Sequence, residues 1–226
     1  MLQEIAPDLW HVQHTFSANG MPVSTRMTVV RLRGRVLWLH SPVPLTPALR
    51  EQLGGLGEVG YIVAPCKMHH LFIGPCAQAY PAAQVYGAPG LAGKRPDLTT
   101  LRSLDPTLAP PWHEELEQVF IDGIPIGNEV AFYHRASRTL ILTDLLQWWR
   151  GDIPFGARVF GSLTGVRARL AVPRTVRWMI KDPAALAASV RKLMLWPFER
   201  VVVAHNAIVD EGAYAAVRRA FAVLGE

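Results

Sequence analysis

The chain has 226 residues, of which half are apolar and 18% are charged, a composition that excludes an intrinsically disordered protein. No apolar run reaches the roughly 18 residues that a membrane-spanning helix needs. The formal net charge is +5 and comes mainly from arginine, which fits an anionic partner, although an ordinary solvated surface explains it as well. We expect no membrane partner. A nucleic-acid-binding role driven by the basic balance is the least favoured interpretation, and a steep loss of binding with added salt would be its sign.

Two features bear on compartment and domain organisation. The cysteines Cys66 and Cys76 are too few for a disulfide framework, and the first five residues do not combine a basic start with an apolar core. We therefore expect a cytoplasmic protein. Because one α/β domain often reaches this length, we predict a single domain over residues 1–226.

Several short runs of β-branched and apolar residues are bounded by turn residues, which is the pattern of strands. In chain order the predicted strands are Met27–Leu32, Val36–His40, Val59–Ala64, Val85–Ala88, Val119–Ile124, Glu129–His134, Thr139–Thr143 and Val201–Ala204. The residues between the first two strands, Arg33-Gly34-Arg35, predict a tight turn, and the Arg135-Ala136-Ser137 turn predicts a second hairpin.

Two helices begin with a capping residue followed by proline at the first helical position. Thr46-Pro47 predicts a helix that ends at Gly54-Gly55, and Asp182-Pro183 predicts one that stops before Pro197. A last helix is predicted over Asp210–Leu224.

Two stretches predict little regular structure: residues 89–111, rich in proline, glycine and threonine, and residues 151–180, whose periodicity is weak. Together the elements predict a mixed α/β architecture of two or four layers.

Ligand-capable side chains recur where the predicted strands end, namely at His40, His69-His70, Asp144 and His205. Ligands of layered α/β proteins gather at strand ends, and imidazole with carboxylate suits zinc or iron. Each histidine also fits a hydrogen-bonded structural role, and no compact motif such as H-E-x-x-H ties them together.

Five segments in fixed order resemble a known superfamily. They are Thr25–Leu32, Leu37–Leu45, Val63–Phe72, Arg138–Leu145 and Val201–Asn206. This order is similar to that of the metallo-β-lactamase superfamily, and the runs from Leu37 to Leu45 and around Ala64-Pro65-Cys66-Lys67 resemble its uncharacterised DUF4336 branch. The resemblance implies a four-layer αββα sandwich with a cleft along one edge of the sheets.

The metal motif of that superfamily, H-x-H-x-D-H, falls on Pro65 to His70, and only its last histidine is matched. Pro65 and Lys67 replace the first two histidines, His69 replaces the aspartate, and the later histidine falls near Pro125 and is absent. The bridging aspartate and final histidine match Asp144 and His205. The resemblance therefore implies that the usual first metal site is missing. It leaves one possible set of ligands for a zinc or iron ion, His69, His70, Asp144 and His205.

The resemblance implies a hydrolase-like protein with at most one metal, acting on an ester, lactone or related bond. In that interpretation Asp144, His70 and His205 are catalytic, and Asp144 orients the attacking water. We expect a small-molecule substrate, for which anionic character is suggested by Lys67. The predicted substrate-contacting residues are Lys67, His40, Trp148 and Arg150.

In a second interpretation, the same residues bind no metal. A fully hydrogen-bonded cluster of His70, Asp144 and His205 would hold the loops in place without catalysis. The protein would then be a non-catalytic binding module for an anionic ligand. The sequence leaves both interpretations open, and with them whether the protein is an enzyme and which metal, if any, it holds.

Overall fold

The structure is a computed structural model, and it describes residues 1–18 and 20–224. The chain forms two compact units, which are described separately. The first consists of Met1–His14 and Arg26–Glu115, and the second of Thr15–Thr25 and Leu116–Glu226. The prediction of a single domain over residues 1–226 stays a prediction.

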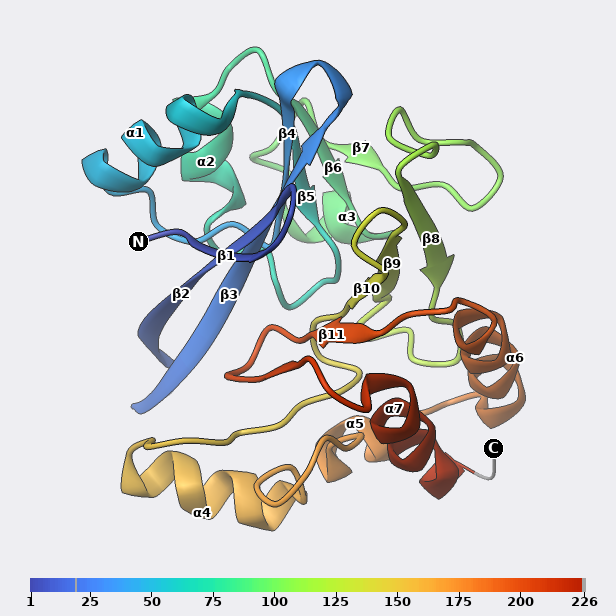
Figure 1. Cartoon of the computed structure of the whole chain (residues 1–226). Helices are drawn as coiled ribbons and strands as arrows, with labels where there is room; N and C mark the ends of the chain where they lie inside the picture. Colours follow the sequence, from blue (N-terminus) through green and yellow to red (C-terminus); the bar gives the residue numbers. More distant parts are fainter. Residues whose placement is uncertain (19, 225–226) are drawn as a thin grey trace. The chain divides into compact units, whose positions relative to one another are not determined.

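A seven-stranded sheet dominates the first unit, with its strands in sequence order (Figure 1). They are β1 (Gln3–Ala6), β2 (Leu9–Ala18), β3 (Met21–Leu32), β4 (Val36–His40), β5 (Glu58–Ala64), β6 (Gln84–Gly87) and β7 (Arg102–Ser103). The strands from β4 to β7 are parallel, whereas β3 and β4 form the predicted antiparallel hairpin. Parallel neighbours need crossover connections. The connections carry the helices α1 (Pro47–Leu56), α2 (Ile73–Ala79) and α3 (Leu91–Lys94).

Local chemistry explains where α1 begins, but its end was predicted too early. The Thr46 side chain accepts a hydrogen bond from the amide of Leu49, and Pro47 occupies the first turn. The helix runs through Gly54-Gly55 and closes at Gly57, whose amide bonds to the carbonyl of Leu53. Two glycines cost a helix about 1 kcal/mol each, and the burial of Leu49 and Leu53 against the sheet offsets this cost.

A five-stranded sheet forms the centre of the second unit, in the order β12-β11-β10-β9-β8. Its strands are β8 (Leu116–Phe120), β9 (Val130–His134), β10 (Thr139–Ile141), β11 (Arg200–Val202) and β12 (Ile208–Val209). Only β10 and β11 pair in parallel; the other pairs are antiparallel. Its helices are α4 (Phe155–Thr164), α5 (Arg174–Trp178), α6 (Pro183–Met194) and α7 (Ala213–Phe221), with short 3-10 turns at Arg33–Arg35 in the first unit and Ala222–Leu224 in the second.

Each unit has its own apolar core. In the first, Leu37, Leu39 and Ile62 on neighbouring strands are fully buried. In the second, Leu140 and Val201 lie beneath α6 and α7, whose apolar residues complete the same cluster. These strands therefore hold the loops at their carboxyl ends in fixed positions.

The mixed α/β class is confirmed, and several boundaries are corrected. β8 begins three residues before its predicted start, and residues 89–111 contain α3 and β7. Residues 151–180 contain α4 and α5, which weak periodicity did not reveal. No prediction covered β1, β2 or α2. In the described part of the chain, no helix combines the length and apolar character needed to cross a bilayer. The cytoplasmic location stays a prediction.

Candidate metal centre

The predicted site residues lie just beyond the carboxyl ends of strands in both units. In the second unit Asp144 follows β10 and His205 follows β11, and these two strands are parallel neighbours. In the first unit His40 ends β4, and the loop that carries His69 follows its parallel neighbour β5. Parallel pairing therefore brings strand ends, and the polar residues on them, to one edge of each sheet.

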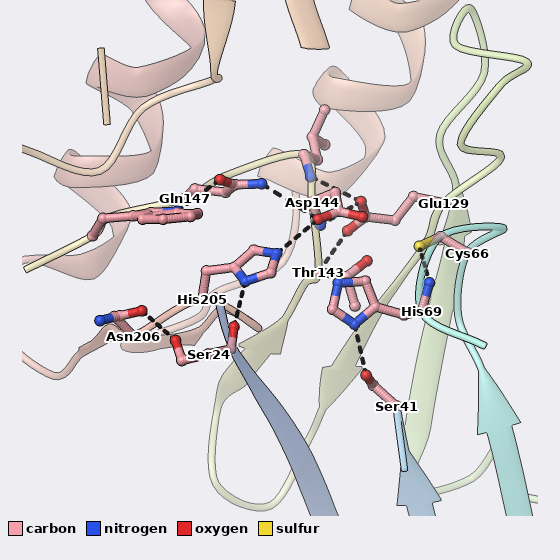
Figure 2. Close-up of polar contacts among 12 residues, drawn as sticks. Ser24, Ser41, Cys66, His69, Glu129, Thr143, Asp144, Gln147, His205 and Asn206 are labelled. Atoms are coloured by element: carbon pink, nitrogen blue, oxygen red, sulfur yellow. Dashed lines mark hydrogen bonds and ion pairs between the residues drawn. The ribbon is translucent and has the colours of Figure 1, made fainter. Parts of the chain in front are cut away.

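His205 and Asp144 form a hydrogen-bonded pair in the second unit. The Nδ1 atom of His205 lies 2.6 Å from the backbone carbonyl oxygen of Ser24, and its Nε2 lies 3.0 Å from Oδ1 of Asp144 (Figure 2). A carbonyl oxygen only accepts hydrogen bonds, so Nδ1 carries a hydrogen. Ser24, in the part of β3 that belongs to the second unit, thus fixes the orientation of the ring.

This orientation decides what the pair can do chemically. When His205 is neutral, its single hydrogen is on Nδ1, and both Nε2 and the Asp144 carboxylate present lone pairs to each other. Two electron-pair donors at 3.0 Å need a positive charge between them. A proton supplies this charge and makes an imidazolium–carboxylate ion pair, and a metal cation supplies it equally.

A buried glutamate holds the loop that carries Asp144. Glu129 accepts hydrogen bonds from three successive amides, those of Thr143 at 2.7 Å, Asp144 at 2.9 Å and Leu145 at 2.8 Å. Burial, followed by the neighbouring charge of Asp144, raises the pKa of Glu129 to about 7. Gln147 supports the site from the other side, because its Nε2 donates to Oδ1 of Asp144 at 3.3 Å.

In the first unit, His69 is oriented by the end of β4. The hydroxyl of Ser41 lies 2.8 Å from Nδ1 of His69, and the amide of His69 donates to Sγ of Cys66 at 3.4 Å (Figure 2). Ser41 adopts a left-handed backbone conformation with φ of 54°, which is unusual for a residue with a side chain. Because Ser41 engages Nδ1, a metal would bind His69 through Nε2.

His40, the last residue of β4, is deeply buried. Its ring stacks on Trp38 with centroids 5.4 Å apart, and only 1% of the residue is exposed. Burial, and secondarily the neighbouring His69, lowers the pKa of His40 to about 3. His40 is therefore a neutral imidazole, and its predicted contact with substrate stays a prediction.

Cations surround His70. Arg95 donates to the backbone carbonyl of His70 at 2.7 Å, and its guanidinium lies 3.5 Å from Nδ1 of the ring. Burial, Lys94 and Arg95 together lower the pKa of His70. Lys94 also donates to the carbonyl of Lys67 at 2.8 Å, so this loop lies in positive surroundings.

Trp148 and Arg150 pack on each other in the second unit. The guanidinium of Arg150 lies 4.9 Å from the Trp148 ring, and its backbone carbonyl accepts a hydrogen bond from Asn206 at 3.4 Å. Arg150 is exposed, whereas Trp148 is partly buried against the core. Their predicted substrate role stays a prediction.

The structure thus joins Asp144 with His205, and His69 with Ser41, inside their respective units. Four supporting residues were missed: Ser24, Ser41, Glu129 and Gln147. Only Glu129 left a signal in the sequence, because a carboxylate directly before the apolar strand Val130–His134 needs a partner when it is buried.

Comparison with solved structures defines the class of fold. A metallo-beta-lactamase from Pontibacter korlensis has a TM-score of 0.67 and 14% identity, with 100% of this chain and 99% of that chain covered. The metal-soaked Flv1 flavodiiron core from Synechocystis sp. PCC6803 has a TM-score of 0.70 and 11% identity, with 100% of this chain and 61% of that chain covered. A metallo beta lactamase from Hirschia baltica has a TM-score of 0.64 and 8% identity, with 99% of this chain and 97% of that chain covered. The predicted metallo-β-lactamase type of fold is confirmed; identities this low show the fold alone.

Sequence comparison then gives the family. The model described as "Domain of unknown function (DUF4336)" matches residues 7–155, and the chain belongs to this family. The resemblance seen in the sequence is therefore confirmed. A search of curated proteins gave no match.

Proposed function

We propose that the protein holds one metal ion through Asp144 and His205 of the second unit, with His69 as a further ligand that the superfamily pattern implies, and acts as a metal-dependent hydrolase. Two imidazole nitrogens and a carboxylate oxygen are a donor set typical of zinc and of non-haem iron, and three protein ligands leave a position for substrate. The observation that carries the proposal is the contact between Nε2 of His205 and Oδ1 of Asp144, which requires a positive charge.

The hydrogen bonds on the opposite ring nitrogens support the same proposal. Metal-binding histidines usually engage a fixed partner through the nitrogen that does not bind the ion, which sets the tautomer and the ring orientation. His205 donates from Nδ1 to the carbonyl of Ser24, and His69 uses Nδ1 toward the hydroxyl of Ser41. In both rings, Nε2 is the nitrogen directed away from this support.

His70 is the weakest member of the four-ligand set that the superfamily pattern implies. Its ring lies next to Arg95, and Lys94 and Arg95 both lower its pKa. Positive neighbours keep the imidazole neutral, as a ligand needs, but they also oppose a cation nearby. We therefore assign His70 to the surroundings of the site, where these cations favour an anionic group of the substrate.

An ion of this kind acts as a Lewis acid on a carbonyl or phosphoryl oxygen and makes water more acidic. The residues of the chain would supply the rest. Asp144 would orient the attacking water and accept its proton, while Glu129 and Gln147 keep the Asp144 loop in place. We propose an ester, lactone or related bond as the substrate.

A metal-free binding module remains the second proposal, and one observation favours it. A protonated His205 forms an ion pair with Asp144 at 3.0 Å, which satisfies both groups without a metal. The protein would then bind an anionic small molecule near Lys67 and Arg95, without turnover.

The metal content of untagged protein, purified without chelators, tests the two proposals. We expect close to one zinc or iron ion per chain by mass spectrometry and a large loss in His205→Ala. His113→Ala is the matched control, because His113 is exposed and bonds only locally to the carbonyl of Pro110 at 2.9 Å. His70→Ala should keep the metal if His70 is outside the ligand set.

The outcomes separate the proposals. Absence of metal from the wild type, even after incubation with zinc, would refute the metallo-hydrolase and leave the binding module. Metal retained in a folded His205→Ala variant would refute the ligand set. Loss of metal in His70→Ala would restore the four-ligand set that the sequence predicted.

A further inference from the structure

Helix α4 of the second unit exposes three large apolar residues, while its inner side consists of small residues and the partly buried Phe160. Its exposed apolar residues are Phe155, Val159 and Leu163, which are 73%, 41% and 67% exposed. The residues that it buries are Ala157, Gly161 and Thr164. Surface helices normally direct their large apolar residues to the core, so three exposed ones on a single short helix are unusual.

The exposed residues form one continuous stripe. Phe155, Val159 and Leu163 are four residues apart, so they lie above one another on one side of the helix. Arg158 and Ser162 lie on the same side, and these five residues line a shallow hollow. All of its lining comes from α4 alone.

The inner face of α4 is packed closely, so the exposed stripe is not the result of a loose helix. A side chain at Gly161 would meet the Cβ of Trp149 at 3.3 Å and that of Arg167 at 3.5 Å. Ala157 joins Trp149 and Val166 in a small buried cluster. The inner side thus holds small residues close to Trp149 and Arg167 together with Phe160, which packs on Trp149 with ring centroids 5.0 Å apart. The three exposed residues are left for an external partner.

Positive charge borders the stripe. Residues 151–180 contain five arginines and one carboxylate, Asp152, and so carry most of the net charge of the chain. The Arg158 guanidinium lies 5.9 Å from the Phe155 ring at one end. At the other end of the stripe, Arg174 donates a hydrogen bond to the carbonyl of Leu163 at 3.0 Å. One turn after Arg174, at the end of α5, Trp178 is 79% exposed.

We propose that this face, made of α4 and the exposed end of α5, docks on an anionic lipid surface. Aromatic and aliphatic side chains would enter the interface between headgroups and acyl chains, while the arginines contact lipid phosphates and carboxylates. Figure 1 shows α4 at the outer edge of its unit with α5 beside it. The chain would lie on the membrane, which differs from the sequence-based expectation of no membrane partner.

Two observations favour a lipid surface over a protein partner. A second copy of the chain, related by a twofold axis, would bring two copies of the same arginine-rich face together, and like charges repel. A partner helix needs a groove between elements, and the hollow on α4 is formed by one helix. A fluid anionic surface needs neither a groove nor a partner with its own shape.

Co-sedimentation of the full chain with vesicles tests this proposal. The vesicles contain either phosphatidylcholine alone or phosphatidylcholine with about 30% phosphatidylserine, a strongly anionic surface. We expect binding to the anionic vesicles only. Added salt should weaken it, because salt screens the attraction between the arginines and the anionic lipids. Arg158→Gln should weaken binding about fivefold. The double variant Phe155→Ser, Leu163→Ser should weaken it at least about tenfold.

Leu108→Ser is the matched control, since Leu108 is 67% exposed but belongs to the first unit. Urea unfolding of every variant checks the fold. No binding of the wild type to anionic vesicles would overturn the proposal. Equal binding of anionic vesicles by the double variant and by the Leu108→Ser control would also overturn the proposal. A dimer in solution that the double variant abolishes would assign the stripe to a second copy and also overturn it.

Discussion

Replacing Glu129 by glutamine is expected to change how the free energy of unfolding depends on pH. Glu129 is buried, and its pKa is raised from the ordinary 4.5 to about 7. A carboxyl group with a raised pKa binds its proton more tightly in the folded state. Its contribution to stability is therefore complete below pH 4.5 and is lost as the pH rises through 7. The shift corresponds to a loss of about 3 kcal/mol.

Glutamine cannot ionise, so the variant lacks this pH dependence, but it introduces a constant penalty. Its amide group can present a carbonyl oxygen to two of the three backbone donors and faces the third with an NH2 group. The amide of Thr143 or Leu145 is then left unpaired, which costs about 1–3 kcal/mol. The wild type should be more stable near pH 4, and its advantage should shrink or reverse near pH 8.

Urea unfolding of both proteins at several pH values measures this difference. Taking the difference between variant and wild type cancels the other titrating groups, which the two share. A constant difference across the range would refute the reasoning, because it would mean that the Glu129 pKa is the same in the folded and unfolded chain. Metal content measured in parallel would show whether Glu129 also keeps Asp144 in place.

Three further predictions concern other parts of the chain. Gly123→Ala should lower the free energy of unfolding by well over 1 kcal/mol, because φ is 84° and the new Cβ would meet the carbonyl oxygen of Asp182 at 2.2 Å. Gly151→Ala, with φ of 86° and open space, should cost only about 1–2 kcal/mol in urea unfolding; equal losses would contradict the steric explanation. Asp182→Ala removes the cap on the amide of Ala185 and should cost about 1 kcal/mol without changing metal content. Burial raises the pKa of Cys76 to about 12, so iodoacetamide at pH 8 should modify this thiol only after urea is added; rapid labelling of the folded protein would contradict this.

Local patterns in the sequence were sufficient for some elements. The hairpin of β3 and β4, the start of α1 at Thr46-Pro47 and the start of α6 at Asp182-Pro183 were all predicted. Turn residues, capping hydrogen bonds and the fixed φ of proline act over a few residues, so they can be identified without a structure. The placement of ligand-capable residues at strand ends was predicted for the same reason.

Other features depend on residues that are distant in the chain. Helix α4 was missed because three of its large apolar residues face outward, and the small residues of its inner face fit closely against Trp149 and Arg167. The support of His205 by Ser24 joins positions 181 residues apart. No periodicity reports such a contact, because it is created when the strands pair and the loops at their ends are brought together.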